Sequence, residues 1–187
     1  GKGKSKSKEK RRKKKAQEEK EKDVRAREAA LLDADRAPET AAEFERLLVA
    51  SPNSSYIWIK YMALHLNMTE IEKAREVSDR ALKQINFREE RERFNVWVAR
   101  MNLEALYGSK DALMSVFEEA CKVCDAKKMH LQLLAILEKG SEPQVTEQFF
   151  KTVTRKYRQS CKAWLRYCQF KLSSAHPEAA SRTLDKA

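Results

Sequence analysis

One pattern recurs along this chain of 187 residues at nearly regular intervals. An apolar, helix-like segment opens at Trp58 (WIKYMALH), Trp97 (WVARMNLE), Leu131 (LQLLAILE) and Trp164 (WLRYCQFK), at steps of 39, 34 and 33 residues. A catalytic motif need occur only once in a domain, whereas a scaffold of stacked units must repeat its packing residues. The recurrence therefore indicates architecture before it indicates chemistry.

A second series interleaves with the first and shares its period. Its members open at Phe44, Ser78, Phe117, Phe150 and Leu184, at steps of 34, 39, 33 and 34 residues. The long step falls between the same two units in both series, so we expect the extra residues around 86–93, as an extended helix start or a longer loop. A period near 34 residues with two helices per unit is typical of a helical solenoid.

Composition and segment boundaries predict helices throughout. The chain has only 4 Gly and 4 Pro and is rich in the strong helix formers Ala, Leu, Glu, Lys and Arg. Polar junctions at 51–54, 67–69, 107–109, 140–143 and 173–177 supply caps or helix stops, and Thr69 with Glu72 fits a capping box. We predict an all-α, right-handed helical-hairpin solenoid of about four repeats over residues 31–187, truncated at its C-terminal end.

The first unit shows which faces pack. Trp58, Tyr61, Met62 and His65 are spaced i, i+3, i+4 and i+7, so they lie on one face of a helix. The facing stripe of the next helix comprises Ile71, Ala74, Val77, Ser78, Ala81, Leu82 and Ile85. Its small members let the two helices approach closely. We therefore interpret the three tryptophans of the chain as packing residues.

Basic residues concentrate at the N-terminus. The chain carries a net charge of +11, and residues 1–22 alone hold 12 Lys or Arg against 4 Glu, which leaves +3 for the rest. The tail includes Lys8, Lys10, Arg11, Arg12, Lys13, Lys14 and Lys15. Without apolar residues, the linker over residues 1–30 is expected to be disordered, grading into helix from about residue 16. It fits a nuclear localisation signal, an arm for RNA or DNA, or a solubilising linker.

Metal and catalytic sites find little support in the sequence. Four cysteines (Cys121, Cys124, Cys161 and Cys168) lack a second ligand pair at zinc-finger spacing, so we expect reduced, largely buried thiols. The three histidines (His65, His130 and His176) are far apart and none sits in a nucleophile setting. No apolar run is long enough for a membrane span. We predict no enzyme activity, no cofactor, no small-molecule substrate and no membrane partner.

A second basic cluster falls within the repeats. Its members, which span two consecutive expected helices, are Lys151, Arg155, Lys156, Arg158, Lys162 and Arg166. Tyr157 could stack on a base beside them. The alternative is an ordinary solvated helix surface, and the sequence leaves both interpretations open.

The stretch AREVSDRAL at 74–82, following a W-x-x-Y helix, resembles the half-a-TPR (HAT) repeat. The residues that carry this signature are Trp58, Tyr61, Ala74, Arg80, Ala81, Trp97, Trp164 and Tyr167. The third unit departs from it, with Leu131 in place of Trp and Thr152 in place of the basic residue. The resemblance implies a scaffold in an RNA-processing machine.

Residues 43–108, including ASPNSSYIWIKYM, resemble the start of the C-terminal HAT array of the ribosomal RNA-processing protein five family, called programmed cell death protein eleven in animals. In that family OB-fold RNA-binding repeats and a charged, Lys-rich linker precede the array. The resemblance implies a nucleolar assembly factor in the small-subunit precursor particle. Its implied partners are pre-rRNA, other assembly factors and small nucleolar RNP proteins. The OB-fold repeats are missing here, so their RNA binding cannot be carried over.

Two other functions remain open at this point. One is a HAT scaffold of pre-mRNA splicing or 3′-end processing, which would share the same repeats. The other is a generic TPR-like adaptor that clamps a peptide in its groove. The adaptor predicts Lys, Asn and Arg arranged as a carboxylate clamp, and the sequence shows no convincing one.

Overall fold

The computed structural model describes residues 38–140 and 142–173. The chain divides into two units, Gly1–Thr40 and Ala41–Ala187, and every helix described here belongs to the second. The described residues form eight α-helices and no β-strand, which confirms the all-helical prediction. The helices are α2 (Ala41–Ala50), α3 (Ser55–Asn67), α4 (Ile71–Gln84), α5 (Glu90–Tyr107), α6 (Lys110–Val123), α7 (Ala126–Leu137), α8 (Pro143–Lys156) and α9 (Cys161–Ser173).

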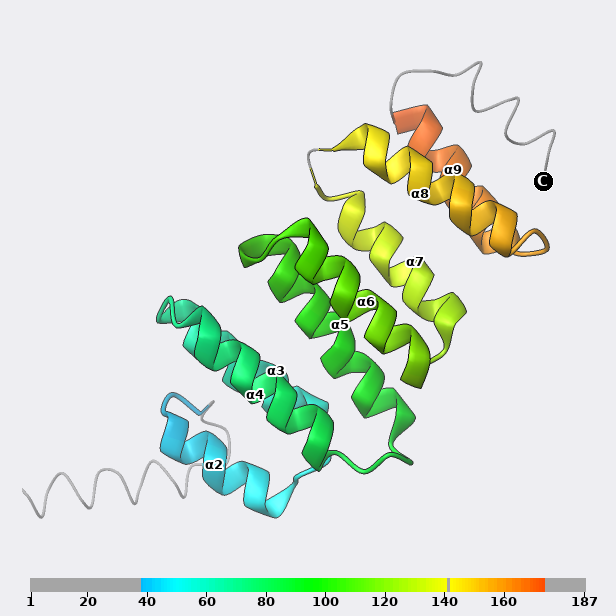
Figure 1. The fold of residues 1–187 in the computed structure, drawn as a ribbon. Coiled ribbons are helices and arrows are strands. Elements are labelled where there is room, and N and C mark those ends of the chain that lie inside the picture. Colours follow the sequence, from blue (N-terminus) through cyan, green and yellow to red (C-terminus); the bar gives the residue numbers. More distant parts are fainter. Residues whose placement is uncertain (1–37, 141, 174–187) are drawn as a thin grey trace, which may run out of the picture. The chain divides into compact units, whose positions relative to one another are not determined.

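The helices stack in chain order (Figure 1). Each contacts the next along the chain, and α3 also contacts α5, as α5 contacts α7. Three clusters of buried side chains follow one another: the first lies within α2–α5, the second mainly within α5–α7, and the third within α7–α9. Contact limited to near neighbours is the property of a repeat array, so the predicted hairpin solenoid is confirmed.

Trp58 anchors the first unit. Its side chain is fully buried (0% exposed), and its indole Nε1 donates a hydrogen bond to Pro52 O at 2.9 Å. The Arg80 guanidinium lies over the ring, 5.6 Å from its centre. Ala74 and Ala81 of α4 are also fully buried. Small side chains on α4 thus leave room for the large indole on α3.

An aromatic pair joins neighbouring helices in the first and last units. Phe44 of α2 stacks on Tyr61 of α3 with ring centres 5.2 Å apart and planes within 9°. At the equivalent positions, Phe150 of α8 stacks on Tyr167 of α9 at 5.1 Å and 15°. The Phe of each pair belongs to one repeating series of the sequence, and the Tyr belongs to the other. Residues of the two series therefore contact each other across neighbouring helices.

A polar network replaces this stack in the second unit. At the equivalent positions Arg100 of α5 donates a hydrogen bond to Ser78 Oγ of α4 at 2.7 Å. One turn further along α5, Glu104 is only 3% exposed and accepts two hydrogen bonds from Arg75 of α4, at 2.9 and 2.8 Å. The Arg100 guanidinium also approaches Glu104, at 3.2 Å. One buried carboxylate and two partly buried guanidinium groups thus link α4 to α5.

The long repeat step comes from an extended helix start, as the sequence allowed. Trp58 is the fourth residue of α3, whereas Trp97 is the eighth residue of α5, the longest described helix. Trp164 Nε1 donates to the carbonyl six residues earlier, that of Arg158, as Trp58 does. The carbonyl six residues before Trp97 belongs to Arg91, which lies inside α5. Trp97 Nε1 consequently has no hydrogen-bond partner among the described residues.

The capping box predicted at Thr69 and Glu72 is wrong. Helix α4 begins at Ile71, and Thr69 lies in the preceding turn with a φ of 60°. Its hydroxyl donates to Met68 O at 2.6 Å and therefore does not cap the helix. A positive φ is unusual for a β-branched residue. The tight turn that follows α3 imposes this conformation on Thr69, and capping of α4 does not.

Several predictions fall on residues that the structure does not describe. The basic residues at 8–15, the whole 1–30 linker and the expected helix start near residue 16 lie outside the described residues. The same holds for Leu184, His176 and residues 31–37 of the predicted array.

Candidate nucleic-acid interface

The last described hairpin carries the basic excess of the repeats. Residues 143–173 hold seven Lys or Arg against one Glu, a net charge of +6. Residues 41–142 hold 15 Lys or Arg against 16 Asp or Glu, a net charge of −1. Figure 1 shows this hairpin, α8 and α9, at the end of the described array. The net positive charge of residues 41–173 therefore comes from this one hairpin.

Four of the six predicted cluster members lie near the α8–α9 turn. Arg155 and Lys156 are in the last turn of α8, Arg158 follows in the connection, and Lys162 is in the first turn of α9. All four are exposed. Arg155, Arg158 and Lys162 form no ion pair with any other described residue, so their charges face solvent.

The other two members are paired within the array. Lys151 pairs with Glu147 one turn earlier on α8, at 3.1 Å. Half-buried Arg166 of α9 donates to the Glu138 carboxylate, at 2.5 and 3.0 Å, and to Leu131 O at 2.9 Å. Arg166 thereby ties α9 back to α7. The freely available charge is concentrated at the turn rather than along both helices.

Tyr157 is half-buried and engaged with the core. Its ring meets His130 edge-on, with centres 5.3 Å apart and planes at 80°. The Tyr157 hydroxyl lies 3.3 Å from His130 Nδ1, and the Lys156 ammonium lies 5.7 Å from the Tyr157 ring centre. These contacts leave less of the ring available to stack on a base than a fully exposed tyrosine would offer.

His130 connects the basic turn to the core. It is buried between Phe117, which it meets edge-on at 4.9 Å, and Phe149, on which it stacks at 6.0 Å. His130 Nδ1 lies 2.6 Å from Ala126 O and must donate to it, because a carbonyl only accepts. That leaves Nε2 as the acceptor facing the Lys156 ammonium at 3.5 Å. A neutral ring that carries its proton on Nδ1 fits both contacts.

Stability is expected to fall on acidification through His130. Burial lowers the pKa of His130 below its ordinary value of 6.5, and the Lys156 ammonium lowers it further, against the Ala126 hydrogen bond. At a pH between the pKa of His130 in the folded chain and its value of 6.5 in the unfolded chain, the unfolded chain binds more protons. The contribution of neutral His130 to the free energy of unfolding is therefore fully present above pH 6.5 and is lost as the pH falls below it. Urea unfolding at pH 7.5, 6.5 and 5.5 should show this decline, and His130→Phe should flatten it. Equal pH slopes in the two proteins would contradict this role of His130.

One basic residue of this hairpin was missed by the sequence. Lys171 of α9 is only 13% exposed, pairs with Glu147 at 2.7 Å and lies over the Tyr167 ring at 5.8 Å. This hydrogen bond is the main cause that lowers the pKa of Glu147. The sequence spacing could have predicted the contact with Tyr167, because Lys171 follows Tyr167 by one helical turn. Lys171 therefore stabilises the packing of α8 against α9 and is not free to bind RNA.

The cysteines are free thiols in different environments. Cys168 is buried, while Cys121 and Cys124 are partly buried, and burial raises the pKa of all three. Cys161 is exposed at the start of α9, so the prediction of a buried thiol is wrong there. Within residues 38–140 and 142–173, no three His, Cys, Asp or Glu residues gather in a way that could hold a metal ion. None of the helices described is long and apolar enough to cross a membrane.

Comparison with known proteins points to one group. No family model matches the chain. It is 44% identical over 155 residues to "rRNA biogenesis protein rrp5" of Schizosaccharomyces pombe, 45% over 160 residues to "Protein RRP5 homolog" of Homo sapiens, and 43% over 166 residues to "rRNA biogenesis protein RRP5" of Arabidopsis thaliana. These matches cover 83%, 86% and 88% of this chain, but only 9%, 9% and 8% of those proteins. The resemblance predicted from residues 43–108 is confirmed.

Proposed function

Because this chain is homologous to one segment of the RRP5 proteins, we propose that it is a scaffold segment for ribosome biogenesis. It would act in pre-rRNA processing within the small-subunit precursor particle, the 90S pre-ribosome, and would be located in the nucleus and nucleolus. Its partners would be pre-rRNA, other pre-ribosome assembly factors and small nucleolar RNP proteins.

The α8–α9 hairpin is the part of the array proposed to contact pre-rRNA. The observation that carries this proposal is the +6 charge of residues 143–173, with Arg155, Arg158 and Lys162 exposed around one turn and not ion-paired to any described residue. Basic side chains bind phosphates with release of counterions, largely without reading sequence. The basic tail at residues 2–15 would add a second contact without sequence preference and could serve as a nuclear localisation signal.

A scaffold accounts for the described residues better than an enzyme does. His65 packs on the Tyr61 ring and its Nδ1 lies 2.8 Å from the Glu70 carboxylate. His130 packs among aromatic rings with its Nδ1 4.0 Å from Cys121 Sγ, but burial raises the pKa of that thiol, the opposite of an activated nucleophile. Most of the large side chains that repeat along the sequence are buried between helices rather than gathered in a cleft, and Trp164 is partly buried. The matched proteins favour ribosome biogenesis over a HAT scaffold of splicing or 3′-end processing.

Reversing the charges at this turn should weaken RNA binding. We expect Arg155→Glu, Arg158→Glu and Lys162→Glu together to reduce affinity for single-stranded RNA about tenfold or more. The slope of log K against log salt should fall by roughly 0.7 for each phosphate that the variant no longer neutralises. Fluorescence polarisation at several salt concentrations measures both quantities. Crosslinking in cells should recover precursor ribosomal RNA, with less of it from the triple variant.

A matched control removes the general effect of charge. Arg46, Lys60 and Lys83 are exposed on α2, α3 and α4, and reversing all three changes the net charge by the same amount. This control should bind RNA nearly as well as the unaltered chain. Equal losses in both triple variants would reject the α8–α9 interface. Crosslinks mainly to messenger precursors would instead favour the splicing or 3′-end alternative.

A further inference from the structure

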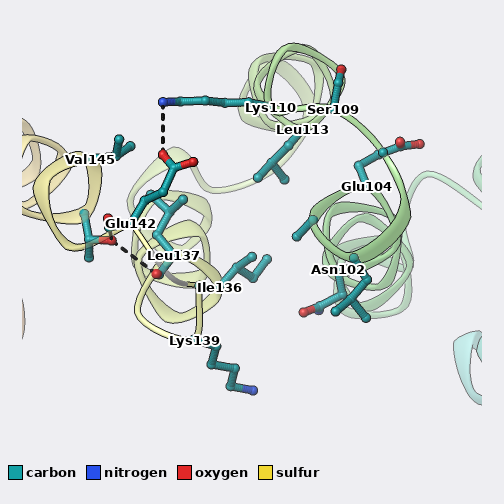
Figure 2. A pocket seen from close by; sticks show the side chains of 15 residues that line it. Asn102, Glu104, Ser109, Lys110, Leu113, Ile136, Leu137, Lys139, Glu142 and Val145 are labelled. Atoms are coloured by element: carbon teal, nitrogen blue, oxygen red, sulfur yellow. Dashed lines mark hydrogen bonds and ion pairs between the residues drawn. The ribbon is translucent and has the colours of Figure 1, made fainter.

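A pocket of ≈ 430 Å³ opens between the α5–α6 turn and the α7–α8 turn (Figure 2). Its apolar wall consists of Ala105, Leu106, Leu113, Ile136, Leu137 and Val145. Figure 2 shows Leu113 and Ile136 directed into the space between the helices. Leu106 of this wall is 75% exposed, so part of the apolar lining is open to solvent. Exposed apolar surface around a cavity is typical of a binding site.

The polar groups in the wall are already bonded within the chain. Thr146 Oγ1 lies within hydrogen-bond distance of two acceptors, Leu137 O at 3.1 Å and Glu142 O at 3.0 Å. Ser109 Oγ accepts from Ala112 N at the start of α6. Glu104 is held by Arg75. The interior therefore offers an occupant mainly apolar contact rather than unsatisfied hydrogen-bonding groups.

The rim of the pocket is positive. Lys110 and Lys139 stand on opposite sides of it in Figure 2. Lys110 lies 3.6 Å from Glu142, the one exposed acidic residue of the lining. Lys139 is exposed and forms no ion pair with any other described residue. The buried Glu104 is balanced by Arg75, so the rim keeps a surplus of one positive charge that suits carboxylates.

We propose that this pocket binds an acidic peptide segment of a partner protein. One large apolar side chain of the peptide would fill the space between Leu113, Ile136 and Val145, and neighbouring carboxylates would pair with Lys139 and Lys110. The volume suits one or two large side chains, and charge complementarity selects an acidic rather than a basic segment. The proposal goes beyond RNA contact, because it assigns a protein-binding site to another part of the array.

The pocket and the basic turn lie at opposite ends of α8. Val145 and Thr146 are in the first turn of this helix, and Arg155 and Lys156 are in its last. At 1.5 Å per residue the two ends are roughly 15 Å apart. A peptide in the pocket and RNA at the turn could therefore be held at the same time, as a scaffold requires.

The test uses three fluorescent ten-residue peptides and the full chain. Each has a central Leu-Phe pair, flanked by Asp and Glu in the first peptide, by Lys in the second and by Ser in the third. We expect the acidic peptide to bind most tightly by fluorescence polarisation. Lys139→Glu and Leu106→Ser, both at exposed positions, should each weaken it about fivefold. Circular dichroism melting curves establish that both variants remain folded.

A matched control separates the pocket from the basic turn. Arg155→Glu also reverses one exposed basic charge, but at the far end of α8, and should leave binding of the acidic peptide nearly unchanged. The proposal is overturned if Arg155→Glu weakens binding as much as Lys139→Glu, because the peptide would then be held by general charge. It is also overturned if no peptide binds at about 1 mM, or if the basic peptide binds best. None of these outcomes bears on RNA binding, so the two proposals can fail separately.

Discussion

Replacing Trp58 by Ala is expected to lower the free energy of unfolding by about 3–5 kcal/mol. The side chain is fully buried, donates a hydrogen bond to Pro52 O and lies beneath the Arg80 guanidinium, so the substitution removes a large apolar volume and two polar contacts. Stacked helices on both sides limit how far the site can collapse around the cavity. Urea unfolding followed by circular dichroism measures the loss.

Trp164→Ala is the matched comparison. Trp164 holds the equivalent position in α9 and donates the equivalent hydrogen bond, to Arg158 O, but its side chain is only partly buried. Replacing Trp164 by Ala removes less buried apolar area than replacing Trp58, so the loss of stability should be clearly smaller. Equal losses at the two positions would show that burial is not what distinguishes the repeat tryptophans.

Replacing Glu104 by Gln should cost about 3 kcal/mol of the free energy of unfolding. The carboxylate is 3% exposed and is held by Arg75 and Arg100. The amide would remove the one buried counter-charge of both guanidinium groups, leaving Arg75 with the exposed Glu72 and Arg100 with Asp79 at 3.7 Å. Arg75 is partly exposed and can regain some hydration, which keeps the loss at the lower end of the range for broken buried pairs. Thermal and urea unfolding both report it.

Glu72→Gln supplies the exposed counterpart. Glu72 pairs with the same Arg75 at 2.5 Å, but its side chain is 80% exposed. An exposed pair of this kind contributes little, so this substitution should change stability by less than about 0.5 kcal/mol. A loss comparable to that of Glu104→Gln would mean that Arg75 requires both carboxylates equally, contrary to their burial.

The sequence predicts which residues are buried where burial depends only on their spacing along one helix. The spacing of Trp58, Tyr61, Met62 and His65 depends only on 3.6 residues per turn, and all four are buried on one face of α3. The long repeat step likewise placed the extra residues at the start of α5. Thr69 was misassigned because a tight turn, rather than helix capping, determined its backbone.

Partners from distant parts of the chain were not predictable. Arg166 looked like a free basic residue in sequence, but its partner Glu138 lies 28 positions earlier. Lys171 likewise pairs with Glu147 on the preceding helix. A list of charges cannot reveal which are neutralised. The pocket was missed for the same reason, because its wall comes from four helices and no local motif encodes it.

The sequence by itself determined the repeat period, the helical class and the family, because identical packing problems recur in every unit and require similar residues at the same spacing. Tertiary structure alone decided which charges remain available and where a pocket opens. Those properties depend on how side chains from successive units meet across the stacked helices. Long-range distances of this kind are set by packing and leave no periodic trace in the chain.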